Sequence, residues 1–168
     1  MKLLILSDEH GDSLSLDAVL EHNRDIDTLI FLGDGMRDIE TLTQERPDLR
    51  VYAARGNCDY ASYAPVDGLA PFGGVLFYYT HGHIYSVKST LDKLAAAASA
   101  RGAQVALFGH THQRACCRIG DVWLFNPGAL SRFEYGGCYG IITIENGTPR
   151  FEHHSLDEEK PKASAGPF

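Results

Sequence analysis

Short apolar segments recur along the first two thirds of the chain and predict buried strands. Between several of them, apolar residues follow the 3.6-residue spacing of helices. The predicted strands are residues 2–6, 28–32, 49–54, 75–80 and 105–108. One predicted helix follows a cap at Asp12 or Ser13, one carries Met36 and ends near Pro47, and one runs from Val87 to Arg101. Residues 60–74, with two prolines and several glycines, predict an irregular loop.

The last third of the chain changes to short strands without helices between them. Gly120-Asp121 and Asn146-Gly147 are dipeptides typical of hairpin turns. The expected strands are residues 114–119, 122–125, 139–144 and 149–154. Alternating strands and helices indicate a parallel arrangement, and hairpins indicate an antiparallel extension. We therefore predict an α/β protein with either one mixed sheet or two packed sheets. Residues 1–156 form one domain in this interpretation, and residues 157–168 form a flexible tail.

Composition narrows the range of partners. The chain has 168 residues and a formal charge of −7, which argues against nucleic acid or an anionic membrane as the main partner. A phosphorylated small substrate stays compatible, because bound divalent cations dominate the local charge of a site. The apolar start is too short for a signal peptide, and no apolar run reaches the roughly 20 residues of a membrane span. The four cysteines form no C-x-x-C pair, so we expect free thiols and a cytoplasmic protein.

Side chains that bind metals follow each of the first five predicted strands. They are Asp8 and His10, Asp34, Asn57, His81, and His110 with His112. Open α/β sheets collect their ligands at the carboxyl ends of parallel strands. Carboxylate, amide and imidazole groups suit Mn²⁺, Fe²⁺, Zn²⁺ or Ni²⁺. Strand alternation alone would direct both imidazoles of Gly109-His110-Thr111-His112 toward one ion, with the glycine giving the backbone room to bend.

Each of these residues also has a purely structural interpretation. Asp8 could cap the following helix, and Asp34 and Asn57 beside glycines could be turn residues. His81 could be a half-buried histidine with a hydrogen-bond partner. All of these interpretations would have to hold together at five strand ends, and this makes a shared metal centre the better hypothesis.

The order of these motifs resembles the calcineurin-like metallophosphoesterase superfamily. Its signature runs D-x-H, G-D, G-N-x-[D/E], H and G-H-x-H. Here the elements are Asp8-Glu9-His10, Gly33-Asp34, Gly56-Asn57-Cys58-Asp59, His81-Gly82-His83 and Gly109-His110-Thr111-His112. The short length, the Cys in the third motif and Asn126-Pro127-Gly128 are similar to the small bacterial and archaeal phosphodiesterase subfamily. A eukaryotic retromer subunit shares this fold group.

The resemblance implies a sandwich of two mixed sheets flanked by helices, in α/β/β/α layers. It also implies two divalent ions, with Mn²⁺ expected first and Fe²⁺, Zn²⁺ or Ni²⁺ as alternatives. One ion would take Asp8, His10, Asp34 and His112. The other would take Asn57, His81 and His110, with Asp34 bridging the pair. Such a pair holds a bridging hydroxide that attacks a phosphoester in line.

Two departures from the family pattern bear on the chemistry. The serine/threonine phosphatase branch has a histidine acid at the position of Cys58, and Asp59 would orient it. A thiol is a weak substitute for that acid, so we expect poor turnover of alkyl phosphomonoesters. Glu9 could repel an anionic substrate, bind metal through water, or point away from the site.

Several further side chains are candidates for substrate contact. Arg55 is either a phosphate clamp or a solvent-facing strand end. His83 either touches substrate or orients its neighbour, and Arg132 is a further substrate-binding candidate. The aromatic side chains of Tyr60, Tyr63, Phe72 and Trp123 would line a pocket or form a contact in a homo-oligomer.

The leading hypothesis is a dimetal phosphodiesterase that acts on a small or activated phosphodiester, with Asn57, Cys58 and Asp59 closest to the chemistry. The alternative is a protein-binding scaffold that keeps the fold without catalysis, and it predicts eroded ligands. A protein with purely structural metals is a third possibility, although seven ligands around two ions favour an open, water-bearing site.

Overall fold

Two five-stranded sheets form the centre of the computed structural model, which describes residues 1–157 except for the side chains of residues 134 and 135. The first sheet has the order β10-β9-β1-β2-β3. Its strands are β1 (Lys2–Leu6), β2 (Thr28–Phe31), β3 (Arg50–Ala53), β9 (Cys138–Glu145) and β10 (Thr148–Ser155). Strands β1, β2 and β3 are parallel, and β9 pairs antiparallel with both β1 and β10.

The second sheet has the order β4-β5-β6-β8-β7. Its strands are β4 (Asp67–Phe72), β5 (Val75–Thr80), β6 (Val105–Leu107), β7 (Arg114–Ile119) and β8 (Val122–Pro127). Strands β5, β6 and β8 are parallel, whereas β4 and β7 are antiparallel edge strands. The sequence left one or two sheets open, and the structure has two mixed sheets, as the family resemblance implied.

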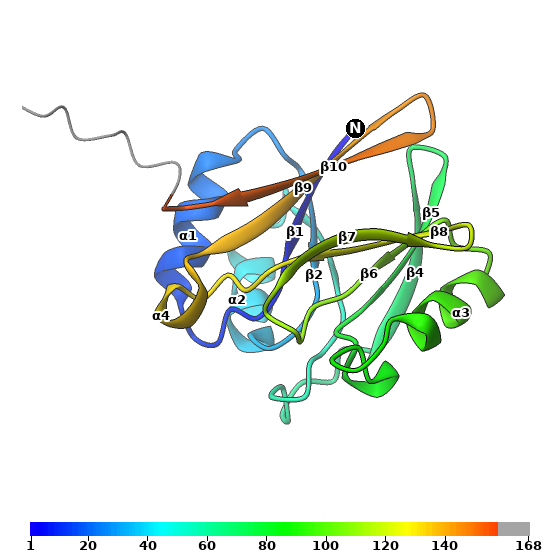
Figure 1. The fold of residues 1–168 in the computed structure, drawn as a ribbon. Coiled ribbons are helices and arrows are strands. Elements are labelled where there is room, and N and C mark those ends of the chain that lie inside the picture. The colour runs from blue at the N-terminus through cyan, green and yellow to red at the C-terminus, as the bar shows by residue number, and fades with distance from the viewer. Residues whose placement is uncertain (158–168) are drawn as a thin grey trace, which may run out of the picture.

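The helices cover the outer faces of both sheets. Helices α1 (Ser13–His22) and α2 (Met36–Glu45) pack on the first sheet, and α3 (Asp92–Ala100) packs on the second. Figure 1 shows α1 and α2 on one side of the molecule and α3 on the other. A 3₁₀ turn, η1 (His83–Tyr85), follows β5, and a short helix, α4 (Arg132–Tyr135), follows β8. The expected layering of helix, sheet, sheet and helix is confirmed.

The position of β1 between the second sheet and the helices explains why its sequence is continuously apolar. Leu3 and Ile5 point into the core between the two sheets, whereas Leu4 and Leu6 point toward α1 and α2. All four side chains are buried. A strand covered on both faces has no need of polar alternation, so its carboxyl end can carry polar groups into a site without disturbing the core.

Three sequence predictions need correction. Residues 67–72 form β4 instead of a loop, and Pro71 fits there because β4 is an edge strand. Helix α3 begins at Asp92, so Val87 and Leu91 lie before it, although both pack in its apolar cluster. Phe72 lies in the inter-sheet core and is not available for a pocket or an oligomer contact.

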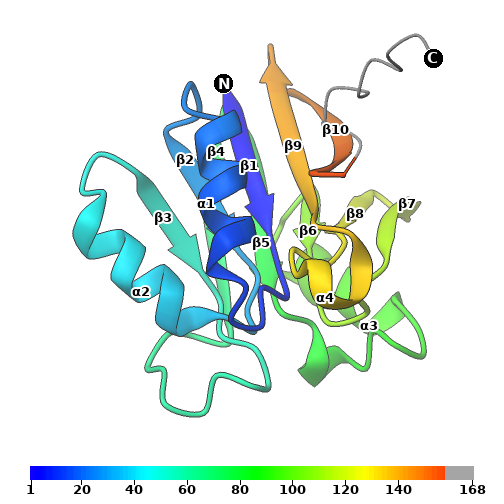
Figure 2. The same ribbon diagram turned by 90° about the vertical axis from the view of Figure 1, so that its left-hand side faces the viewer.

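The expected tail, residues 157–168, lies outside the described residues apart from Asp157. Strand β10 ends at Ser155, beside the short helix α4 (Figure 2).

Candidate metal centre

The carboxyl ends of β1, β2, β3, β5 and β6 meet at one edge of the sandwich, and the structure brings their loops together. Backbone hydrogen bonds join the first two loops, from Asp8 N to Gly33 O at 2.9 Å and from His10 N to Asp34 O at 2.9 Å. Gly109 N donates to His81 O at 3.0 Å, which joins the β5 and β6 loops. All seven predicted metal ligands lie in this group of loops: Asp8, His10, Asp34, Asn57, His81, His110 and His112.

One group of donors consists of Asp8, His10 and His112. The Nε2 atom of His112 lies 3.1 Å from Asp8 Oδ1 and 3.3 Å from His10 Nε2. The other carboxylate oxygen, Asp8 Oδ2, accepts from Ser7 Oγ at 2.5 Å and from His110 N at 3.0 Å. Those two bonds fix the carboxylate so that Oδ1 faces the two imidazoles.

A second group consists of Asn57, His81 and His110. The Nε2 atom of His81 lies 3.1 Å from Asn57 Oδ1 and 3.2 Å from His110 Nδ1. His81 Nδ1 lies 2.7 Å from Leu32 O. Because a carbonyl can only accept, Nδ1 carries a proton, and Nε2 is the ring nitrogen that faces the site. His110 and His112 therefore face different groups of donors.

Asp34 lies between the two groups. Its Oδ2 atom is 3.4 Å from His81 Nε2 and 3.9 Å from His10 Nε2, and its Oδ1 atom accepts from Cys58 N at 2.8 Å. This placement is what a bridging carboxylate requires.

The backbone at the site is strained. Asp8, His10, Asp34, His110 and His112 all have φ between 51° and 66°. Such left-handed conformations are uncommon for residues other than glycine and cost of order 1–3 kcal/mol each. Among the non-glycine residues of the described chain only Ser86 and Asn146 share them. Backbone strain is thus concentrated on the predicted ligands, as expected where a site is held in shape by the surrounding fold.

Two motif glycines are required by close approach. A Cβ atom on Gly109 would lie 1.8 Å from Ser7 Oγ, and one on Gly56 would lie 2.0 Å from Asp34 Oδ1. Neither residue has a positive φ. The chain bends at His110 and Thr111, directly after Gly109, and the missing side chain of Gly109 also lets two strand ends touch.

The donor set fits divalent cations. Asp8 Oδ1 is buried and accepts no hydrogen bond from the described residues, which is costly unless a cation faces it. Two pairs of imidazole nitrogens lie 3.2 and 3.3 Å apart, which is close enough for each pair to share one cation. Nitrogen and oxygen donors without a thiolate are typical of first-row divalent ions.

The electrostatics of the group favour an ionised Asp34. Burial opposes ionisation, but the hydrogen bond and positive charge of His81 outweigh it and hold the Asp34 pKa well below its usual range. Burial also lowers the pKa of His81, yet its bond to Asp34 and the charge of Asp8 raise it overall. Burial and the nearby His81 lower the pKa of His110 to about 4, so His110 is a neutral donor at pH 7.

Asp59 lies next to the site but faces the backbone. Its two carboxylate oxygens accept from four N–H groups at 2.7–3.0 Å: those of Asp34, Gly35, Met36 and Gly56. The first three belong to the start of α2, where a negative charge is favourable. This side chain is thus tied to the loop that carries Asp34.

Cys58 is exposed at the rim of the site. Asn57 Nδ2 lies 3.3 Å from its sulfur. Partial burial and the neighbouring carboxylates, Asp34 first, raise the pKa of the thiol to about 11. It therefore holds its proton at neutral pH and is a weak acid.

The three predicted substrate residues are placed differently. The His83 ring lies 5.5 Å from that of His81 and 6.2 Å from that of His110, and its buried Nδ1 has no hydrogen-bond partner among the described residues. Arg55 Nη1 donates to Ser62 O at 3.3 Å. Arg132 Nε lies 3.9 Å from Asp157 Oδ1. Only His83 is joined directly to the ligand histidines by these contacts.

Sequence reasoning assigned no role to the Asn126 side chain. It is fully buried, and its Nδ2 donates to Gly109 O at 2.9 Å and to Thr111 Oγ1 at 3.1 Å. Its Oδ1 accepts from Gly128 N at 2.9 Å. Asn126 therefore fixes the loop that carries His110 and His112, and its place at the end of a parallel strand was the available signal.

Glu9 lines the hollow next to Asp34, together with His10 and Cys58. The side chain is fully buried, its Oε2 accepts from Gly11 N at 2.8 Å, and its Oε1 has no partner among the described residues. Burial raises its pKa to about 7, and Asp38 adds to the effect. Its printed hydrogen bond thus goes to the backbone of its own loop, while the side chain borders the hollow that Asp34 also lines.

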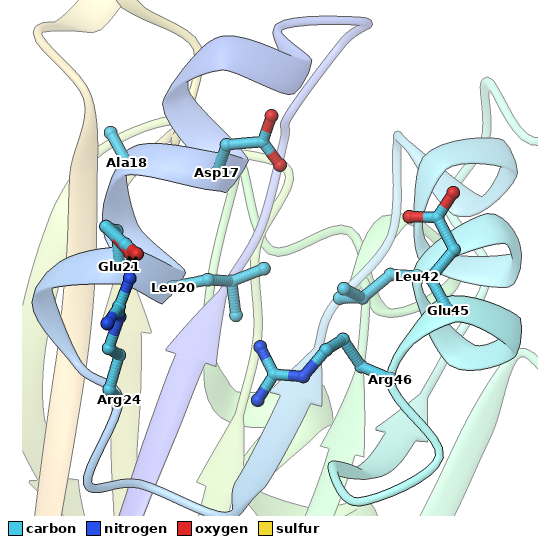
Figure 3. Close-up of a pocket in the computed structure, with 8 residues that line it drawn as sticks. All are labelled: Asp17, Ala18, Leu20, Glu21, Arg24, Leu42, Glu45 and Arg46. Atoms are coloured by element: carbon cyan, nitrogen blue, oxygen red, sulfur yellow. Dashed lines mark hydrogen bonds and ion pairs between the residues drawn. The ribbon is translucent and has the colours of Figure 1, made fainter.

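A hollow of about 760 Å³ lies away from these ligands, between α1 and α2. Figure 3 shows Leu20 and Leu42 facing each other across it, with charged side chains along the rim. Arg24 is paired with Glu21 there, and Arg46 with Asp48. The hollows beside the metal ligands are smaller, at about 410 Å³ next to Asp34 and about 320 Å³ next to His112. The largest of these three hollows therefore does not coincide with the candidate metal centre.

No helix in the described part of the chain is both long and apolar enough to cross a membrane.

Comparison with known proteins agrees with the geometry. Residues 1–147 match the model of the calcineurin-like phosphoesterase superfamily domain. The chain is 34% identical to the probable metallophosphoesterase YsnB of Bacillus subtilis over 164 residues, covering 94% of each protein. It is 30% identical to the phosphodiesterase YfcE of Escherichia coli K12, covering 84% of this chain and 87% of that one.

The fold has close counterparts among solved structures. A predicted phosphoesterase from Streptococcus pneumoniae superimposes with a TM-score of 0.79 at 24% identity, covering 93% of this chain and 90% of that one. At that identity the likeness shows the fold alone, and the family model with the two relatives carries the assignment. The chain belongs to the calcineurin-like phosphoesterase superfamily.

Proposed function

We propose that this protein is a phosphodiesterase that depends on two divalent cations and acts on a small or activated phosphodiester. The observation that carries the proposal is the convergence of seven nitrogen and oxygen donors from five loops around Asp34. The buried, unpartnered Asp8 Oδ1 supports it, because a cation would remove the cost of its burial.

In this proposal the seven side chains divide into two sets. Asp8, His10 and His112 hold one ion, Asn57, His81 and His110 hold the other, and Asp34 contributes to both. Mn²⁺ is the expected ion, with Fe²⁺, Zn²⁺ or Ni²⁺ compatible with the same donors. When bound, such a pair neutralises the phosphate charge and lowers the pKa of water.

The protein's own residues then set which esters react. Cys58 is exposed at the rim of the site, and its high pKa makes it a poor proton donor to a leaving alkoxide. His83, whose ring lies 5.5 Å from that of His81 and 6.2 Å from that of His110, is the candidate for contact with the substrate phosphate. The proposal therefore favours esters whose leaving group has a low pKa, and it expects slow turnover of alkyl phosphomonoesters.

The test is hydrolysis of bis(p-nitrophenyl) phosphate by protein stripped of metal and reloaded with Mn²⁺. We expect turnover that requires the ion and falls at least about a hundredfold in Asp34→Asn, as is typical when transition-state charge stabilisation is lost. Asp48→Asn is the matched control, because Asp48 is exposed and paired only with Arg46 among the described ion pairs. Absence of metal-dependent turnover would favour the alternative, a protein-binding scaffold of the same fold.

A further inference from the structure

Phe133 is a large apolar side chain that the fold leaves in solvent at the edge of the metal centre. It is 82% exposed and lies on α4. Together with His10, His112 and Ser131 it lines a hollow of about 320 Å³. A phenylalanine that contributes so little to the core has no evident structural reason for its size. Its neighbours in this hollow are two of the proposed ligands.

The start of α4 is fixed to the metal-binding loop. Leu130 N donates to Ser7 O at 2.9 Å, and Ser131 N donates to Asp8 O at 3.2 Å. Arg132 N donates to Asp12 Oδ2 at 2.9 Å, and the same carboxylate accepts from Ser15 at the start of α1. Three consecutive backbone groups thus tie α4 to the segment that carries Asp8. Figure 2 shows α4 beside the loop that follows β1.

A fixed aromatic face beside an anion-binding centre suits a particular kind of ligand. A phosphate bound between the ions would extend its ester groups into the adjoining hollows. An aromatic ring stacks favourably on another flat ring, by about 1–3 kcal/mol for a nucleic-acid base. An alkyl substituent on the same anionic group would gain much less binding free energy from contact with Phe133.

We propose that Phe133 forms the aromatic wall of a subsite that takes a planar ring attached to the substrate phosphate. This inference rests on the proposed function and names its substrate class: phosphodiesters that carry an aryl or nucleobase group near the phosphorus. The side chain is a specificity determinant that contacts the substrate, whereas Ser131 and Arg132 position it through their backbone.

The inference can be tested with two phosphonates, whose C–P bond is not an ester and stays intact. Phenylphosphonate and methylphosphonate carry the same anionic group and differ in the ring. Calorimetric titration of Mn²⁺-loaded protein measures the Kd of each. We expect phenylphosphonate to bind about tenfold more tightly to the wild type. In Phe133→Ala this ratio should fall to about twofold or less.

Matched variants separate substrate contact from a structural role. Phe133→Tyr keeps the ring and should keep the ratio. Leu14→Ala removes another large apolar side chain that is mostly exposed and does not line this hollow, and it should also keep the ratio. A second arm, with thymidine 5′-phosphate against ribose 5-phosphate, asks whether a nucleobase reaches the same wall. Loss of that preference in Phe133→Ala would assign the subsite to nucleobases, whereas its retention would limit the subsite to aryl groups.

One outcome would overturn the inference while leaving the proposed function intact. It is an unchanged ratio of the two Kd values in Phe133→Ala, including the case in which both phosphonates bind more weakly by the same factor. Failure of the loaded wild type to bind either phosphonate would overturn the proposed function itself, together with this inference.

Discussion

Replacing Asp59 by alanine should lower the free energy of unfolding of the protein, even in the absence of metal and substrate. Its carboxylate accepts from the backbone N–H groups of Asp34, Gly35, Met36 and Gly56. These bonds anchor the first turn of α2 and connect the β2 and β3 loops. A residue that merely oriented a catalytic group through Cys58 would instead affect turnover and leave stability unchanged.

The magnitude follows from the number and type of bonds. Hydrogen bonds to charged groups contribute about 1.5–3 kcal/mol each, and neutral ones about 1 kcal/mol. The side chain is half-buried, so water can replace part of what is lost. Taking about 1 kcal/mol per bond and a modest return from water gives about 3 kcal/mol in all. For a domain of this size that loss lowers the Tm by about 6–12 °C.

The assay is urea unfolding followed by circular dichroism in EDTA, so that bound metal does not contribute. Asp59→Asn should lose less than Asp59→Ala, because its amide keeps one acceptor oxygen. Asp48→Ala is the control, since Asp48 is an exposed partner of Arg46. If Asp59→Ala unfolds with the wild-type free energy to within about 0.5 kcal/mol, the proposed anchoring role is refuted.

Three further predictions use the same chain. Gly109→Ala places a Cβ atom 1.8 Å from Ser7 Oγ, so we expect a loss of about 2–4 kcal/mol in urea unfolding; wild-type stability would contradict the close packing. Glu9 has a folded-state pKa raised from 4.5 to about 7, so the wild type loses stability as pH rises through that window. Glu9→Gln should therefore gain about 1–3 kcal/mol on the wild type in EDTA at pH 8 and almost nothing at pH 4, and an equal difference at both pH values would refute the assignment. Cys58→Ser should change kcat on bis(p-nitrophenyl) phosphate less than about threefold, because this leaving group needs little protonation. A hundredfold loss would show that the thiol is a required acid.

The sequence predicted the fold well wherever periodicity and strand ends were unambiguous. The buried strands β1, β2 and β5 and the cap of α1 at Asp12 follow directly from apolar runs and a capping residue. Strand β4 was not predicted, because Pro71 and the glycines around it are typical of loop sequences. A proline is tolerated there only because β4 is an edge strand, and edge position depends on the whole sheet.

The candidate ligands were predicted from their positions after strands, whereas their division into two groups came from the family resemblance and not from strand geometry. Alternation along an extended strand would send His110 and His112 to one ion. In the fold both residues have a positive φ, and their rings face different donor groups. Asp and His are enriched in left-handed backbone, but the surrounding loops decide which of them adopt it.

Contacts between segments that are distant in the chain could not be predicted from the sequence either. The role of Asn126 depends on Gly109, which is 17 positions away. The exposure of Phe133 beside His112 depends on the hydrogen bonds that fix α4 to the β1 loop. The contacts of such residues become apparent only when the sheets are assembled, because their partners lie far away in the sequence.

The central claim is that two cations bind, one to each donor group, with Asp34 shared. A crystal structure of the Mn²⁺-loaded protein, with anomalous differences measured at the manganese edge, tests this most directly. The account predicts two peaks per chain, one contacting Asp8, His10 and His112 and the other contacting Asn57, His81 and His110, with Asp34 on both. A single peak, or two peaks bound by other residues, would contradict it.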